Sequence, residues 1–160
     1  MEKLVLTAPE SPPHLWLLKG HKAGDNAQLS ALARGLDWPF VEKHLVYRPF
    51  ELLSNRLLGP NLQGIVKAAS SPLEPPWPDL VFTAGRRNEP VARWIQQRAD
   101  RPVRLVHLGR PWAALECFDL IITTPQYRPP PRGLIVVCRQ PLHRLTPLDL
   151  PRARTRTQAP

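Results

Sequence analysis

Three short segments combine glycine with cations in a pattern that suits anion binding. They are GHKAGDN at 20–26, GRRNEP at 85–90 and GRP at 109–111, and a fourth segment, TTPQYRP at 123–129, carries a cation without glycine. Glycine lets a ligand approach the backbone closely, and arginine can place two donors on a phosphate or carboxylate. We call these segments the rim and predict that the rim binds an anionic or phosphate-bearing ligand. Its candidate residues are Gly20, Lys22, Gly24, Asp25, Asn26, Gln28, Gly85, Arg86, Arg87, Gly109 and Arg110.

Each candidate group also has an interpretation that needs no ligand. In the first segment, Lys22 and the free amides of a helix start could receive a phosphate. Alternatively, Asp25 could be the N-cap of that helix and form a capping box with Gln28. Arg86 and Arg87 could simply be solvated, while Asn88 or Glu89 caps the helix that Pro90 helps to start. The spacing matches neither a dinucleotide fingerprint nor a Walker A loop, so the sequence contains no nucleotide motif.

Familiar catalytic patterns are absent from the sequence. It has no GxSxG, no HExxH and no aspartate-rich metal motif, and Cys117 and Cys138 have neither metal-site nor redox spacing. We therefore assign no catalytic residue and no metal. His107 lies inside an expected strand with no carboxylate close in sequence, which favours a hydrogen-bonded core role over that of a base. The five tryptophans are expected to pack in the core or rim, with Trp112, beside Arg110, as the one exception worth testing.

The elements that must position the rim alternate between strand-like and helix-like patterns. Apolar runs at 14–20, 40–47, 78–85, 104–109, 118–125 and 133–138 predict strands, and most are too continuous to have an exposed face. Segments 27–36, 50–58 and 90–99 carry the helical period. This order predicts an α/β fold with a doubly wound, mainly parallel, Rossmann-like sheet. In such sheets ligands bind beyond the carboxyl ends of the strands, where these segments fall.

The positive charge of the chain is concentrated near its C-terminus. Residues 128–160 hold seven Arg and one Asp, whereas residues 1–127 hold 15 Lys/Arg and 12 Asp/Glu. Because residues 1–127 carry nearly equal numbers of positive and negative side chains, a nucleic-acid-binding groove in the folded domain is disfavoured. Electrostatic binding of nucleic acid by the basic C-terminal residues stays open. The sequence has no membrane span or signal segment, so we expect a cytoplasmic protein and leave peripheral membrane contact open. The expected organisation is an arm at 1–13, one domain at 14–147 and a disordered tail at 148–160.

Four segments taken together resemble one known family. They are GHKAGDNAQLSALARGL, PDLVFTAGRRNEPVARWI, RLVHLGRPW and FDLIITTPQYR, which occur in the order found in the mitochondrial fission elongated-mitochondria family, known in bacteria mostly as a domain of unknown function. The resemblance covers roughly residues 14–128 and extends weakly to PLHRLTP at 141–147. The combination of segments is much more specific than any one of them.

The resemblance implies the N-terminal, acceptor-side half of a GT-B-like glycosyltransferase. Such proteins have two Rossmann-like halves facing a cleft, and the second half would hold a sugar nucleotide, so no cofactor is expected for the first half alone. The rim would form one wall of the cleft and bind a phosphate-bearing or sugar-type ligand. PPPRGLIVVCRQ and the tail depart from the family and have the composition of a truncated or frameshifted product, which predicts inactivity alone. The alternative is a non-catalytic interaction module that docks a partner domain or a second copy.

Overall fold

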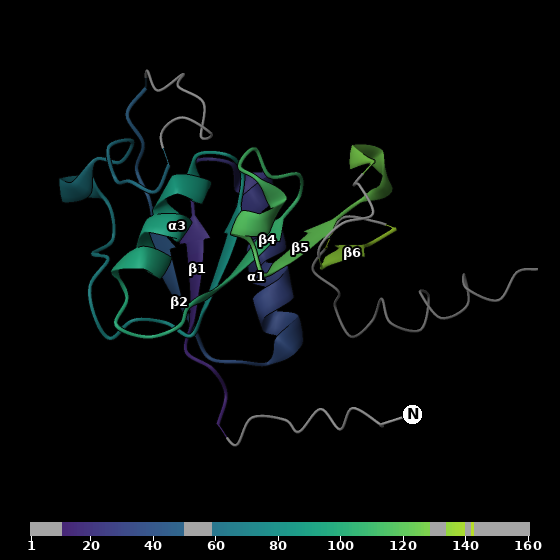
Figure 1. The fold of residues 1–160 in the computed structure, drawn as a ribbon, viewed down its shortest axis with the longest axis horizontal. Coiled ribbons are helices and arrows are strands. Elements are labelled where there is room, and N and C mark those ends of the chain that lie inside the picture. The colour runs from purple at the N-terminus through teal and green to yellow at the C-terminus, as the bar shows by residue number, and fades with distance from the viewer. Residues whose placement is uncertain (1–10, 50–58, 129–133, 140–141, 143–160) are drawn as a thin grey trace, which may run out of the picture.

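Six parallel strands form one sheet in the order β2-β1-β3-β4-β5-β6 (Figure 1). The computed structural model describes residues 11–49, 59–128, 134–139 and 142. The strands are β1 (Leu15–Lys19), β2 (Phe40–His44), β3 (Leu80–Ala84), β4 (Arg104–Leu108), β5 (Leu120–Thr123) and β6 (Ile135–Val137). All six predicted strands and the α/β fold class are therefore confirmed, with each strand shorter than its apolar run.

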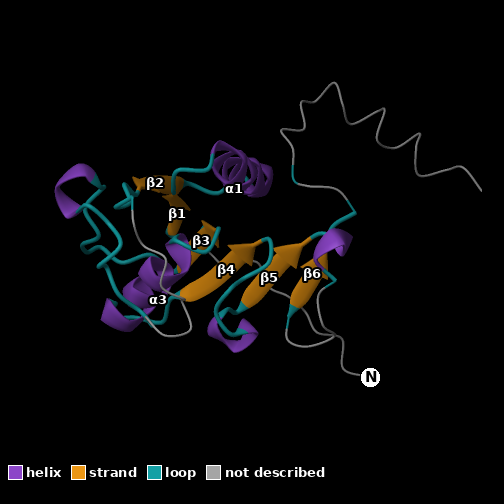
Figure 2. Ribbon diagram, turned by 90° about the horizontal axis from the view of Figure 1, so that it is seen from above, coloured by secondary structure: helices purple, strands orange, loops and turns teal. Residues whose placement is uncertain are grey.

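Helices cover both faces of the sheet, as the continuous apolar strands require. Helix α1 (Ala23–Leu36) connects β1 to β2 and lies on one face, and helix α3 (Asn88–Arg98) connects β3 to β4 and lies on the other (Figure 2). Short 3-10 turns occur at η1 (Lys67–Ala69), η2 (Leu115–Cys117) and η3 (Pro125–Tyr127). The helix predicted at 50–58 and the tail predicted at 148–160 lie outside the described residues.

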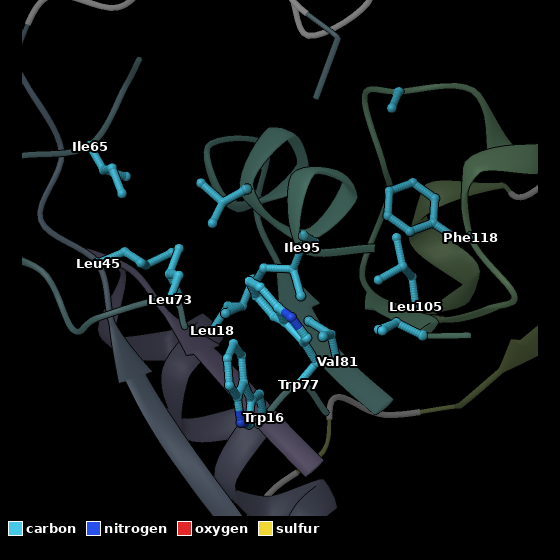
Figure 3. Packing of buried hydrophobic residues seen from close by; sticks show 14 of the residues in the cluster. Trp16, Leu18, Leu45, Ile65, Leu73, Trp77, Val81, Ile95, Leu105 and Phe118 are labelled. Carbon is cyan, nitrogen blue, oxygen red and sulfur yellow. The ribbon is translucent and has the colours of Figure 1, made fainter. Parts of the chain in front are cut away.

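The residues of β1, β3, β4 and β5 alternate between two hydrophobic clusters. Trp16 and Leu18 of β1 pack with Ile95 of α3 in the larger cluster, which also holds Trp77 and Phe118 (Figure 3). Leu15 and Leu17 face the other way and pack with Leu29 and Ala33 of α1 in the second cluster. Because neighbouring residues of a strand point to opposite faces, a strand covered on both sides must be apolar throughout.

The two helices start differently from the sequence prediction. Helix α1 begins at Ala23 rather than 27, its N-cap is Lys22, and no side chain caps it. The capping box of Asp25 and Gln28 is therefore wrong, because Asp25 already lies in the first turn. The N-cap of α3 is Arg87, again without a side-chain cap, so a capping role for Asn88 or Glu89 is also wrong.

The connections reverse direction between β1 and β3, and this reversal locates the site. From β1 the chain crosses on one face to β2 at the edge, whereas from β3 it crosses on the opposite face to β4. In doubly wound sheets the helices diverge at this point and leave a crevice beyond the carboxyl ends of the strands. Within the described part of the chain, no helix is long and apolar enough to span a membrane.

Candidate anion-binding cleft

A cleft of about 900 Å³ lies at the carboxyl ends of β1, β3 and β4, where the connections reverse. It brings together nine predicted site residues from the segments that follow these three strands: Gly20, Lys22, Asp25, Asn26, Gly85, Arg86, Arg87, Gly109 and Arg110. The other lining residues are His21, Ala84, Asn88, Leu108, Pro111, Trp112 and Tyr127. Two predicted residues lie elsewhere: Gly24 is exposed in the first turn of α1, and Gln28 lines a neighbouring cavity of about 60 Å³.

The loop after β1 is closed by Asn26. Its Nδ2 donates to the carbonyl oxygen of Gly20 at 2.8 Å, and its Oδ1 accepts from the Gly20 amide at 3.0 Å. This pair of bonds joins the end of β1 to the first turn of α1. Since no side chain caps that turn, its amides add positive potential beside Lys22 and favour a negative group in the cleft.

Asn88, the first residue of α3, joins β1 to the loop after β2 and lines the cleft. The residue is 3% exposed, its Nδ2 donates to the Leu18 carbonyl at 2.8 Å, and its Oδ1 accepts from the Tyr47 hydroxyl. The same Oδ1 would lie 2.9 Å from a Cβ placed on Gly20. Glycine is therefore required at position 20 because the Asn88 side chain occupies the space that a Cβ needs.

Glu89 ties the loop after β4 to the start of α3. The residue is 0% exposed, its Oε1 accepts from the Trp112 amide at 2.8 Å, and its Oε2 accepts from the Ala113 amide at 2.8 Å. A carboxylate that accepts two backbone bonds in a buried site holds that backbone firmly. Glu89 thus fixes the loop that carries Arg110 and Trp112, although its side chain does not line the cleft.

The paired arginines each lie over an aromatic ring. The Arg86 Cζ is 5.1 Å from the centroid of the Trp112 ring, and the Arg87 Cζ is 5.8 Å from that of Tyr47. Cation–π contacts of this kind restrict where a guanidinium group lies. Trp112 is 59% exposed, unlike the core tryptophans Trp16 and Trp77, and its contact with a ligand stays a prediction.

His107 is buried in β4, but its surroundings differ from the prediction. Neither ring nitrogen has a hydrogen-bond partner within the described residues, and a carboxylate does lie near: Nε2 is 3.8 Å from Oε1 of Glu89. Burial lowers the pKa of His107 from 6.5 to about 3, while the backbone of Arg110 acts in the opposite direction. The imidazole is therefore neutral at physiological pH, and its contact with Glu89 is not an ion pair there.

This low pKa predicts acid sensitivity. Above pH 6.5 the folded and unfolded chains both hold neutral His107, whereas between 6.5 and about 3 only the unfolded chain takes up the proton. The free energy of unfolding should then fall by on the order of 1 kcal/mol per pH unit from this group as the pH drops. Urea denaturation at pH 7, 6, 5 and 4 measures the slope. The His107→Phe variant should show a shallower slope, and parallel curves for variant and parent would contradict the assignment.

The charge of the cleft favours anions. Among its described lining residues, Lys22, Arg86, Arg87 and Arg110 are cations, whereas Asp25 is the one carboxylate. No group of three or more metal-ligating side chains occurs in the described residues. Cations gathered in a crevice with low-dielectric walls concentrate anions such as phosphate more strongly than solvated cations do.

Sequence reasoning missed several residues of the site. His21, Pro111 and Tyr127 line the cleft from the predicted loops, and their places after strand ends could have identified them. Asn88 and Glu89 are predicted as caps, but Asn88 bonds to Leu18 of β1 and Glu89 bonds to the loop after β4. No local pattern reveals such partners, because they come from elements far apart in the chain.

Comparison with known proteins assigns the chain to a family. The family model described as Mitochondrial fission ELM1 matches residues 23–159, which includes α1 and the loops after β3 and β4. No curated protein and no solved structure matches the chain. The matched range covers most of the sequence, and the family resemblance expected from the sequence is confirmed. The chain belongs to the mitochondrial fission ELM1 family.

Proposed function

We propose that this domain binds a phosphate-bearing ligand in the cleft at the ends of β1, β3 and β4. The observation that carries the proposal is the gathering of Lys22, Arg86, Arg87 and Arg110 around one cleft of about 900 Å³, with Asp25 as the single carboxylate among the described residues that line it. Arginine forks match the oxygen atoms of phosphate, and a crevice at the reversal of a parallel sheet is the usual ligand position in this architecture.

The way the cations are held also supports binding rather than solvation. Arg86 lies over Trp112, Arg87 lies over Tyr47, and the backbone beside Arg110 is held by buried Glu89. Long cationic side chains lose rotamer entropy when they bind a ligand, and contacts that restrict them beforehand reduce this cost. Two arginines on an ordinary solvated loop would need no such contacts.

We further propose that the domain is the acceptor-side half of a GT-B-like glycosyltransferase. Family membership and the Rossmann-like sheet support this assignment. In such an enzyme the sugar nucleotide would be held by the second half. The domain by itself is therefore expected to bind its phosphate-bearing or sugar-type ligand without turning it over.

Removing both arginines should greatly weaken phosphate binding. The Arg86→Ala/Arg87→Ala variant is expected to lose at least about a hundredfold in affinity, because it lacks two charge-assisted hydrogen bonds that each contribute about 1.5–3 kcal/mol. Isothermal titration calorimetry with inorganic phosphate measures this change. The matched control is Arg93→Ala/Arg98→Ala on α3, which removes two positive charges from residues that do not line the cleft. Parent-like binding by the Arg86/Arg87 variant would remove the basis of the proposal.

A further inference from the structure

We infer that the cleft holds two anionic groups of one ligand in separate subsites, so that its ligand is a diphosphate or another compound with two anionic groups. One subsite lies beside Arg86 and Arg110, and the other beside Arg87 and Lys22. The inference rests on the proposed function and specifies the class of ligand that the same cleft takes.

The two arginines are neighbours in the chain but contact rings on different sides of the cleft. Arg86 lies over Trp112, which follows β4, whereas Arg87 lies over Tyr47, which follows β2. In the sheet, β2 and β4 flank β1 and β3 from opposite sides. The two guanidinium groups are therefore directed toward opposite sides of the loop that carries them.

Each arginine has a second cation on its own side. Arg110 precedes Trp112 by two residues in the loop after β4. Lys22 follows His21, whose ring lies 6.3 Å from that of Tyr47, the ring under Arg87. All four cations line the cleft. The positive charge thus forms two groups, each of one arginine and one further cation.

The separation of the two groups is built into buried contacts. Tyr47 is held by its hydroxyl bond to Asn88, which is itself bonded to the Leu18 carbonyl, and the Trp112 backbone is held by Glu89. A phosphate bound beside one ring would contact the arginine held there, and a second anionic group would contact the arginine held at the other ring. A cleft of about 900 Å³ has room for a larger ligand that reaches both.

Calorimetric titration of the whole chain with inorganic phosphate and with pyrophosphate, at one ionic strength, tests the inference. We expect pyrophosphate to bind more tightly in the parent. Arg86→Gln and Arg87→Gln should each lower pyrophosphate affinity about tenfold and change phosphate affinity less than about threefold, because one intact subsite still accepts phosphate. Arg98→Gln, the same change in the last turn of α3, should leave both affinities unchanged.

The outcomes separate this inference from the proposed function. If each single variant lowers the two affinities by the same factor, the four cations form one shared site, which overturns the inference while phosphate binding stands. If the parent binds neither probe, both proposals fail. Trp112→Leu is a second variant that retains every charge. It should weaken pyrophosphate more than phosphate, and equal weakening of both would count against separate subsites.

Discussion

Replacing Glu89 with alanine is expected to lower the free energy of unfolding by about 3 kcal/mol, because the amides of Trp112 and Ala113 would lose their acceptors in a buried site. Glu89→Gln should cost less, since one carboxamide oxygen can still accept one of the two bonds. Urea denaturation measures both variants. Glu116→Ala removes the carboxylate of an exposed residue and provides the matched control. It should lower the free energy of unfolding by less than about 0.5 kcal/mol.

The Glu89→Ala variant also tests whether the stability of the fold and phosphate binding both depend on the loop after β4. Because Glu89 fixes the backbone beside Arg110, its loss should weaken phosphate binding although its side chain does not line the cleft. The Glu116→Ala control should bind phosphate like the parent. Equal stability losses in Glu89→Ala and Glu116→Ala would show that the two backbone bonds do not hold this loop.

Replacing Gly85 with alanine is expected to lower the free energy of unfolding by about 2–3 kcal/mol, because left-handed backbone costs about 1–2 kcal/mol for a residue with a Cβ and a close contact adds to it. Gly85 has φ 74°, and a Cβ there would lie 2.8 Å from Oδ2 of Asp25. The Asp25 carboxylate would have to move away from the end of β3. Thermal and urea denaturation measure the loss.

Gly109 supplies the matched control for Gly85. It has φ 91°, but no atom lies within 4 Å of the Cβ position, so Gly109→Ala should show the cost of the backbone conformation alone. An Asp25→Ala background should remove the additional cost at Gly85. If Gly85→Ala and Gly109→Ala cost the same in the parent, the Asp25 contact has no energetic role.

The architecture could be predicted from sequence because its signals are local. Continuous apolar runs such as the one containing Trp16 and Leu17 indicate strands buried on both faces, and the alternation with helical periods leads to a parallel sheet. Helix boundaries were harder to predict. The presence of Gly24 favours a loop over residues 20–26, yet Gly24 lies in the first turn of α1. In the same turn, the Asn26 side chain bonds back to Gly20 and tightens the connection.

The candidate site could be located from sequence, but its internal contacts could not. Parallel topology brings the ends of β1, β3 and β4 to one edge, and this predicted that Lys22, Arg86 and Arg110 would meet. The contacts of Glu89 with the loop after β4 and of Tyr47 with Asn88 join segments more than 20 residues apart. Such pairs depend on how the finished sheet places its loops, which residue spacing does not encode.

A phosphate titration followed at individual backbone amides by NMR tests most directly whether the cleft binds phosphate. We expect the amides of 20–26, 85–88, Gly109, Arg110 and Trp112 to shift together with one saturating dependence on phosphate concentration. Amides at the opposite end of the sheet, such as those of Arg101 and Arg104, should stay unchanged. An absence of saturable shifts in these three loops, or shifts confined to other parts of the chain, would contradict the claim.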